Sequence, residues 1–228
     1  MPVEFIDLYC ERTGPEFWAE PFNALSNAAF LVAAFWAWRV ARARGGMDAL
    51  EKALIALAAA IGVGSFLFHV FASAGTELAD VIPIWSFVGL YVLTIIYRST
   101  GQDPRRTIRI AGIAAVVTTG VIWFTSGDIT TDPGAERDLF NGSLQYAPAL
   151  IALLVFAGLT TLRGHPVRNY VVTAAAMFLL SLVFRSIDLQ VCDVAIIGTH
   201  FLWHLLNALM VGVLLQALVV ALPPRRGG

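Results

Sequence analysis

Seven long apolar stretches dominate the sequence, and each is long enough to cross a bilayer as a helix. A crossing needs about 20 residues, because a helix rises about 1.5 Å per residue through a hydrocarbon core of about 30 Å. Inside that core a helix pairs its own backbone N–H and C=O groups, which water would otherwise have to satisfy. We predict helices over residues 24–43, 49–71, 78–98, 108–124, 144–162, 169–187 and 198–222. The fold class expected is an all-α integral membrane protein with seven transmembrane helices.

The composition agrees with a membrane protein and excludes several other classes. Charged residues make up only 14% of the chain, whereas soluble domains carry roughly 25%. The net charge of −1 offers no basis for binding nucleic acid. The start of the chain lacks a basic segment followed by a cleavage site, so the first apolar stretch is expected to act as its own insertion signal. We expect one domain over 1–228, with an extracytoplasmic segment at 1–23, the bundle at 24–222 and a tail at 223–228.

The positions of arginine and lysine predict how the bundle lies in the membrane. Most of these residues fall between the first and second, third and fourth, and fifth and sixth helices, or in the tail. Only Arg12, Arg137 and Arg185 fall on the other side. Basic residues stay in the cytoplasm, so we expect the N-terminus outside and the C-terminus inside. Scarce lysine beside abundant arginine and alanine suggests a bacterial inner-membrane protein; a eukaryotic one would lie in the endoplasmic reticulum or Golgi.

Polar side chains within the apolar stretches are expected to meet at one membrane depth. His69 lies near the outer end of the second helix, Asp80 at the outer start of the third, and His200 and His204 at the outer start of the seventh. Ser65 and His69 are four residues apart, as are His200 and His204, so each pair shares a helix face. Polar groups in a bilayer are costly and usually functional. Three imidazoles and a carboxylate suffice for a metal site with an open position.

The chemistry expected of such a site is metal-assisted hydrolysis of a lipid amide or ester. Zn²⁺ would be held by His69, His200 and His204 and would lower the pKa of a bound water to about 7. Asp80 would act as general base and pass the proton to the leaving amine, while Ser65 would orient a ligand or an oxyanion. The alternatives are packing roles: hydrogen-bonded histidines, a serine bonded to its own helix, and an aspartate that caps one.

The outer side carries other residues that bear on the site. Cys10 and Cys192 both fall there, where an oxidising exterior would allow a disulfide, although two free thiols remain open. Arg185 and Asp188 are three residues apart near the outer end of the sixth helix, and we expect them to pair and to support the metal ligands. The N-terminal segment also gathers carboxylates, which suit Ca²⁺.

Several motifs together resemble the alkaline ceramidases. They are Tyr9-Cys10-Glu11, Ala-Glu-Pro-Phe-Asn-Ala-Leu-Ser-Asn over 19–27, Gly-x-Gly-Ser-x-x-Phe-His over 62–69, Asp80 with Ile82-Pro83-Ile84-Trp85, and His200-x-x-Trp203-His204. This family belongs to a superfamily of seven-helix membrane hydrolases that also contains the adiponectin receptors. The resemblance extends from Asp7 to Leu206, which is nearly the whole chain.

The resemblance implies a zinc enzyme that hydrolyses the amide of ceramide or a related N-acyl lipid. It implies zinc on His69, His200 and His204, with Ser65 and Asp80 at the zinc-bound water. It also implies a calcium site in the N-terminal segment, for which the best matches are Glu11, Glu20 and Asp7. Two positions depart from the family pattern: Leu8 replaces an aspartate and Thr13 replaces an asparagine.

Two other functions fit the sequence. One is the same hydrolysis on another membrane lipid amide or ester. The other is a seven-helix receptor or sensor with a structural zinc site, although the chain lacks the long N-terminal region of the adiponectin receptors. A retinal protein is excluded because Lys52, the only lysine, does not lie in the last helix.

Overall fold

The described part of the chain folds as a bundle of helices without strands. The computed structural model describes residues 5–99, 101, 103–125 and 140–224, with the backbone alone described at 114, 115 and 117–125. The α-helices are α1 (Pro21–Ser26), α2 (Ala28–Ala43), α3 (Ala49–Phe71), α4 (Ala74–Ser99), α5 (Pro104–Thr125), α6 (Ala147–Leu162), α7 (Arg168–Ile187) and α8 (His200–Gln216). Shorter turns are η1 (Ser143–Tyr146), η2 (Asp188–Gln190) and the π-helical η3 (Ala217–Ala221).

The helices coincide with the predicted apolar stretches, and six qualify as membrane spans. These spans are Pro21–Ala43, Ala49–Phe71, Ala74–Ser99, Ser143–Leu162, Arg168–Gln190 and His200–Ala221. The helix α5 covers the predicted range 108–124 but is not among the six in the described residues, so seven crossings stay a prediction. Much of the predicted connection 125–143 and of the tail 223–228 lies outside the described residues.

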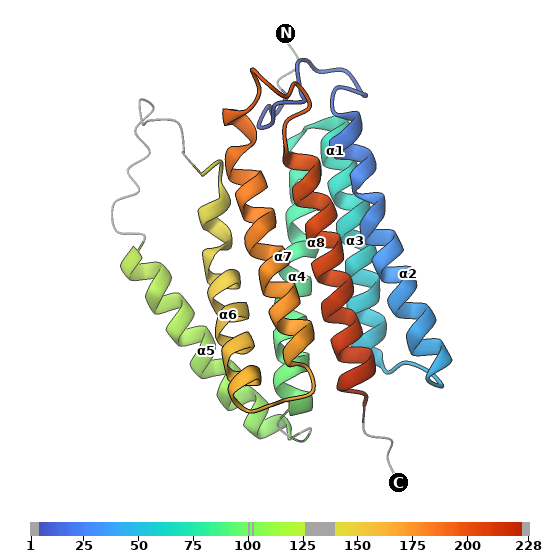
Figure 1. Cartoon of the computed structure of the whole chain (residues 1–228), viewed down its shortest axis with the longest axis vertical. Coiled ribbons are helices and arrows are strands. Elements are labelled where there is room, and N and C mark those ends of the chain that lie inside the picture. The colour runs from blue at the N-terminus through green and yellow to red at the C-terminus, as the bar shows by residue number, and fades with distance from the viewer. Residues whose placement is uncertain (1–4, 100, 102, 126–139, 225–228) are drawn as a thin grey trace.

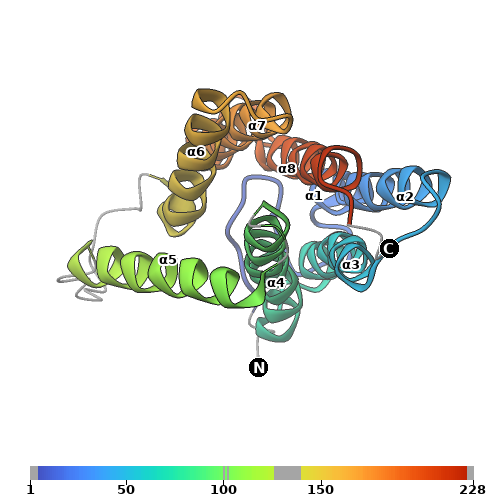
Figure 2. The same ribbon diagram turned by 90° about the horizontal axis from the view of Figure 1, so that it is seen from below.

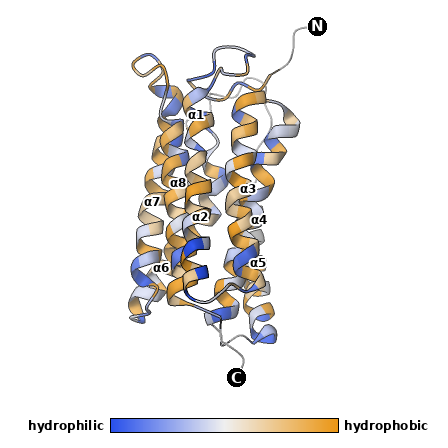
Figure 3. Cartoon of the chain, turned by 90° about the vertical axis from the view of Figure 1, so that its right-hand side faces the viewer, coloured by the Kyte–Doolittle hydropathy of each residue, from blue (hydrophilic) through white to orange (hydrophobic). Residues whose placement is uncertain are grey.

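The long helices other than α5 run side by side along one axis, and α5 crosses that axis obliquely (Figure 1). The helix α3 packs between α2 and α4, and α8 packs between α2 and α7. Figure 2 shows α5 at the edge of the bundle, next to α4. Figure 3 shows apolar residues along the middle of the helices and hydrophilic ones gathered near the ends. Large apolar side chains such as Val32, Ile113 and Val116 are exposed, as is expected of a surface that faces lipid.

A buried ion cluster fixes the end of the bundle near the C-terminus. Glu51 is fully buried in the first turn of α3, where it forms a capping box with Asp48. Arg44 Nη2 donates to one Glu51 oxygen at 2.6 Å, and Arg98 Nη1 donates to the other at 3.0 Å. Arg44 also donates to the carbonyl of Val219 in η3. The cluster therefore joins α3, α4 and the end of the last helix, and every charge in it is paired.

Gly64 allows α3 and α4 to touch through their backbones at the opposite end. A methyl group at this position would lie 2.0 Å from the carbonyl oxygen of Ala79 and 3.2 Å from the backbone nitrogen of Asp80. Only glycine fits such a contact without moving a helix. The close approach sets Ser65, the next residue on α3, against the start of α4, which carries Asp80.

We expect Gly64→Ala to lower the melting temperature of the detergent-solubilised protein by several degrees. The added methyl group would push α4 away, and overpacking of this kind costs about 1–3 kcal/mol. Gly89→Ala in α4 is the matched control, since a methyl group there has nothing within 4 Å. Equal melting temperatures of the two variants would show that the contact is not needed.

Candidate metal centre

Three histidines from the two ends of the chain meet inside the bundle. His69 lies in the last turn of α3, and His200 and His204 lie in the first turns of α8. Each of them offers a ligand nitrogen, and these atoms lie within 4.8 Å of one another. Within the described residues this is the one cluster of three or more side chains able to hold a metal ion. The predicted ligands are thus brought together, and all three are buried.

Glu20 fixes the orientation of His69. The carboxylate oxygen Oε2 lies 2.6 Å from Nδ1 of His69, so Nδ1–H donates to it and Nε2 is left without a proton. Asn23 Nδ2 donates to the same oxygen at 2.9 Å, and Arg12 Nε donates to the other oxygen. Burial raises the pKa of Glu20, but the hydrogen bond and charge of His69, with bonds from Asn23 and Arg12, outweigh it and lower the pKa below its ordinary value. Glu20 is therefore ionised.

A second hydrogen-bond chain orients His204. The hydroxyl of Ser26 donates to the carbonyl of Asn23 at 2.9 Å, which leaves its oxygen free to accept. Nδ1 of His204 lies 2.8 Å from this oxygen, which accepts from it in the tautomer that carries a proton on Nδ1. Nε2 of His204 is then the nitrogen without a proton. Both histidines consequently present the same atom to the centre.

Two of the ring nitrogens are spaced as ligands of a tetrahedral metal ion would be. The Nε2 atoms of His69 and His204 lie 3.2 Å apart. Two ligands about 2.0–2.1 Å from a tetrahedral ion would be separated by about 3.3 Å. Two unprotonated nitrogens facing each other would repel without a cation between them. His200 Nδ1 is buried with no hydrogen-bond partner among the described residues. The donor set therefore fits a divalent metal such as zinc.

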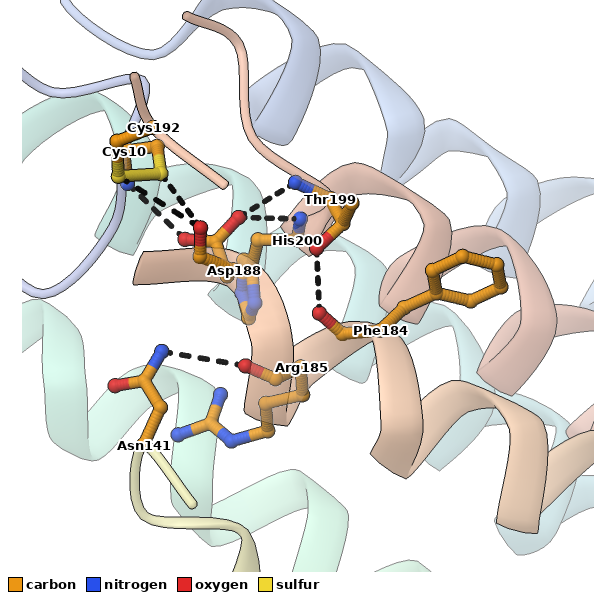
Figure 4. The surroundings of a disulfide bond; sticks show 8 residues. All are labelled: Cys10, Asn141, Phe184, Arg185, Asp188, Cys192, Thr199 and His200. Carbon is orange, nitrogen blue, oxygen red and sulfur yellow. Dashed lines mark hydrogen bonds between the residues drawn. A yellow bond between two sulfur atoms is a disulfide. The ribbon is translucent and has the colours of Figure 1, made fainter. Parts of the chain in front are cut away.

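Tyr9 covers His200 from the N-terminal segment. The two rings are stacked, with their centroids 3.6 Å apart and an angle of 16° between planes. Burial raises the pKa of the Tyr9 phenol to about 12, although neighbouring Arg185 opposes the shift, so the hydroxyl stays protonated at neutral pH. The next residue, Cys10, forms the predicted disulfide with Cys192 (Figure 4). The disulfide holds the segment against the loop before α8.

The expected pairing of Arg185 with Asp188 is wrong. Asp188 is buried and accepts instead from the backbone N–H groups of Cys10, Thr199 and His200, at 3.0, 2.6 and 2.9 Å (Figure 4). Arg185 Nη1 donates to the Tyr9 hydroxyl at 3.0 Å. The reason is that α7 ends at Ile187 and Asp188 begins the turn η2, so the spacing of a continuous helix does not apply. Asp188 does support the centre, because it holds the start of α8 in place.

Ser65 and Asp80 line a large cavity that reaches the histidines. The cavity measures about 1270 Å³ and is also lined by His200, His204 and Arg185. From there it runs between α4, α6 and α8 toward the other end of the bundle, past apolar side chains that include Ile84, Phe87, Val88, Ile95, Leu153 and Phe156. Oδ1 of Asp80 is buried with no hydrogen-bond partner among the described residues. A carboxylate, a hydroxyl and two imidazoles thus face one apolar cavity.

The carboxylates predicted to bind calcium have other partners. Glu11 accepts from the backbone N–H groups of Phe22 and Asn23, at 2.6 and 2.8 Å, and so caps α1. Burial raises the pKa of Glu11, against the effect of these bonds. Asp7 is exposed, and burial of part of its carboxyl, together with the charge of Glu20, raises its pKa.

Arg12 occupies the position between Glu20 and the neighbouring carbonyl oxygens. It donates to Glu20, to the carbonyl of Gly14 at 2.9 Å and to the carbonyl of His69 at 2.8 Å. A guanidinium therefore takes up the oxygen ligands that a calcium ion would need. This donor set does not fit calcium.

A comparison with known protein families assigns the chain to a family. The chain matches the family described as Ceramidase over residues 9–222, which is almost its full length. The chain belongs to the ceramidase family. Membership implies a hydrolase that acts on amides and has a lipid substrate. A search of curated proteins finds no match to the chain.

Sequence reasoning missed several residues through which this ceramidase-family site is built. Tyr9, Arg12 and Ser26 were not assigned a role at the histidines. Ser26 lies within the family motif over 19–27, near the start of the first apolar stretch. Arg12 is one of the few basic residues on the site side of the bundle. Because Arg12 is an isolated basic residue among several carboxylates, the sequence could have indicated that it pairs with one of them.

We expect Glu20→Gln to weaken zinc binding about 10- to 100-fold, because a neutral amide polarises His69 less and does not fix its tautomer. Ser26→Ala should act in the same direction through His204. Glu16→Gln is the matched control, since Glu16 is exposed in the same segment. Competition with a zinc-chelating dye measures the affinity, and equal values for all three variants would contradict the assignment.

Calcium is expected to have no effect on the stability of the protein. A ligand present at 100 times its dissociation constant stabilises a protein by about 2.7 kcal/mol, which raises the melting temperature by several degrees. Protein stripped of calcium on a chelating resin should melt at the same temperature after calcium is added in the millimolar range. A saturable rise in the melting temperature would show that a calcium site exists despite Arg12.

Proposed function

We propose that this protein is a zinc-dependent hydrolase of membrane lipid amides, which cleaves an N-acyl sphingoid-type lipid into a fatty acid and an amine. The observation that carries the proposal is the pair of Nε2 atoms of His69 and His204, 3.2 Å apart beside a large apolar cavity. Family membership adds the reaction class, which is hydrolysis of an amide.

His69, His200 and His204 would hold the metal. Zinc supplies Lewis-acid activation of water and of the substrate carbonyl. Asp80 accepts the proton from the attacking water and returns it to the nitrogen of the leaving amine. Ser65 donates a hydrogen bond to the carbonyl oxygen as negative charge develops there. Glu20 and Ser26 keep the two histidines in the tautomer that metal binding needs.

The shape of the cavity favours a substrate with a long acyl chain. Its walls beyond Ser65 and Asp80 are apolar over most of the length of the bundle. A chain lying there would place the carboxyl carbon near the histidines. The same machinery would serve another membrane lipid amide or ester. A receptor function is less favoured, since a structural zinc site needs neither Asp80 nor the cavity.

We infer that the metal centre faces the extracytoplasmic side. The disulfide between Cys10 and Cys192 lies at the same end of the bundle as the histidines, and disulfides persist in oxidising compartments. The opposite end carries Arg44 and Arg98, as the distribution of basic residues requires of a cytoplasmic end. The membrane would be the bacterial inner membrane.

Metal content and turnover, measured on the same samples, test the proposal. Wild type should carry about one zinc per chain, and His200→Ala and His204→Ala should lose both the zinc and the release of fatty acid from N-acyl lipids. His165→Ala is the matched control because His165 lies at the other end of the bundle, outside the cluster. A folded wild type without metal would overturn the proposal.

Asp80→Asn should retain zinc and lose about 10²- to 10⁴-fold in turnover, because an amide cannot accept the proton. Unchanged turnover would show that Asp80, which lies inside α4, is not the general base.

A further inference from the structure

Arg185 is a buried cation without an acidic partner. The residue lies near the end of α7 and is 7% exposed. No carboxylate oxygen of the described residues lies within 4.0 Å of its guanidinium. Of its five N–H donors, one bonds to the Tyr9 hydroxyl, and the buried Nε has no partner. Buried charges are normally paired. Asp80 interacts electrostatically with Arg185 but forms no ion pair with it within 4.0 Å, so the guanidinium can still bind an anion from outside the chain.

Aromatic rings hold the guanidinium in place without using its donors. Its Cζ atom lies 5.6 Å from the ring centroids of Tyr9 and Tyr146 and 5.4 Å from that of Trp203. Cation–π contacts of this kind stabilise the charge and fix the plane of the fork. The free N–H groups are consequently preorganised for a planar acceptor.

The guanidinium lies next to the metal centre and faces the same cavity. Tyr9 contacts both Arg185 and the ring of His200. The cavity wall around Arg185 is polar, with Asn141 and Gln145 nearby, whereas the wall deeper in the bundle is apolar. An acyl chain would take the apolar part. The polar part is therefore left for the amine half of the substrate.

We propose that Arg185 binds an anionic group, in the simplest case a carboxylate, carried by the amine half of the lipid amide. A guanidinium and a carboxylate form paired hydrogen bonds that a hydroxyl cannot match. The preferred substrates are then, among the sphingoid-type and related N-acyl lipids, those whose amine half carries an anionic group. This assignment of substrate class rests on the proposed hydrolase function. The binding of the anion itself does not depend on turnover.

Two amides that differ only in this group test the proposal: N-oleoylglycine and N-oleoylethanolamine. Wild type should hydrolyse the glycine amide with a kcat/KM at least about 10-fold higher. Arg185→Gln should lower that value about 10- to 100-fold, change the value for the ethanolamide less than about threefold, and keep its zinc. Arg39→Gln is the control, since Arg39 is an exposed arginine of α2 outside the cavity lining. Equal losses on both amides would overturn the proposal.

Binding of the same probes, followed by tryptophan fluorescence, separates this proposal from the hydrolase function. A preference for N-oleoylglycine that Arg185→Gln abolishes supports the anion site even if neither amide is cleaved. No preference in either protein overturns it. Where Arg185→Gln fails to fold, Arg185→Lys keeps the charge without the fork, and should reduce the preference without abolishing it. Binding of oleate is compared in the same way. If Arg185→Gln weakens oleate binding but leaves the preference between the two amides unchanged, Arg185 binds the carboxylate of the fatty acid product, and the proposal is overturned.

Discussion

An imidazole that binds a metal must have one nitrogen free of protons, and its other nitrogen then needs a partner. Such partners are scarce in an apolar bundle. The hydrogen-bond requirement of the histidines therefore determines how the chain is arranged around the metal centre. His69 finds Glu20, and His204 finds Ser26. Both partners come from the first 27 residues. The N-terminal segment is therefore part of the centre, although it contributes no metal ligand.

Arginines at the two ends of the bundle differ in the groups that neutralise their charge. Arg44 and Arg98 share the carboxylate of Glu51 and tie helices together. Arg12 is held by Glu20 and by carbonyl oxygens, and it takes the place that family resemblance gave to calcium. Arg185 alone of these four is surrounded by rings and keeps most of its donors free. Arg12, Arg44 and Arg98 are therefore structural cations, whereas Arg185 is available to bind a ligand.

The helices and the three histidines could be predicted because both depend on local patterns. Apolar length places the spans, and a spacing of four residues puts His200 and His204 on one face. The contacts of the N-terminal segment could not be predicted, because that segment has no periodicity and its partners lie up to 180 residues away. The pairing of Arg185 with Asp188 failed for a local reason, since the end of α7 falls between the two residues. The fit to calcium could not be judged from the sequence, because it depends on where the Arg12 side chain points, and a sequence does not show that.

The disulfide joins two residues 182 positions apart, and this separation bears on the order of assembly. Chains are made from the N-terminus, so Tyr9 and Cys10 leave the ribosome long before α8 exists. His69 can meet Glu20 early, but His200, His204 and Cys192 arrive only with the last helix. The metal centre is therefore completed at the end of synthesis. In a chain truncated before α8, the N-terminal segment would leave the translocon without the His200 ring that Tyr9 contacts in the full chain.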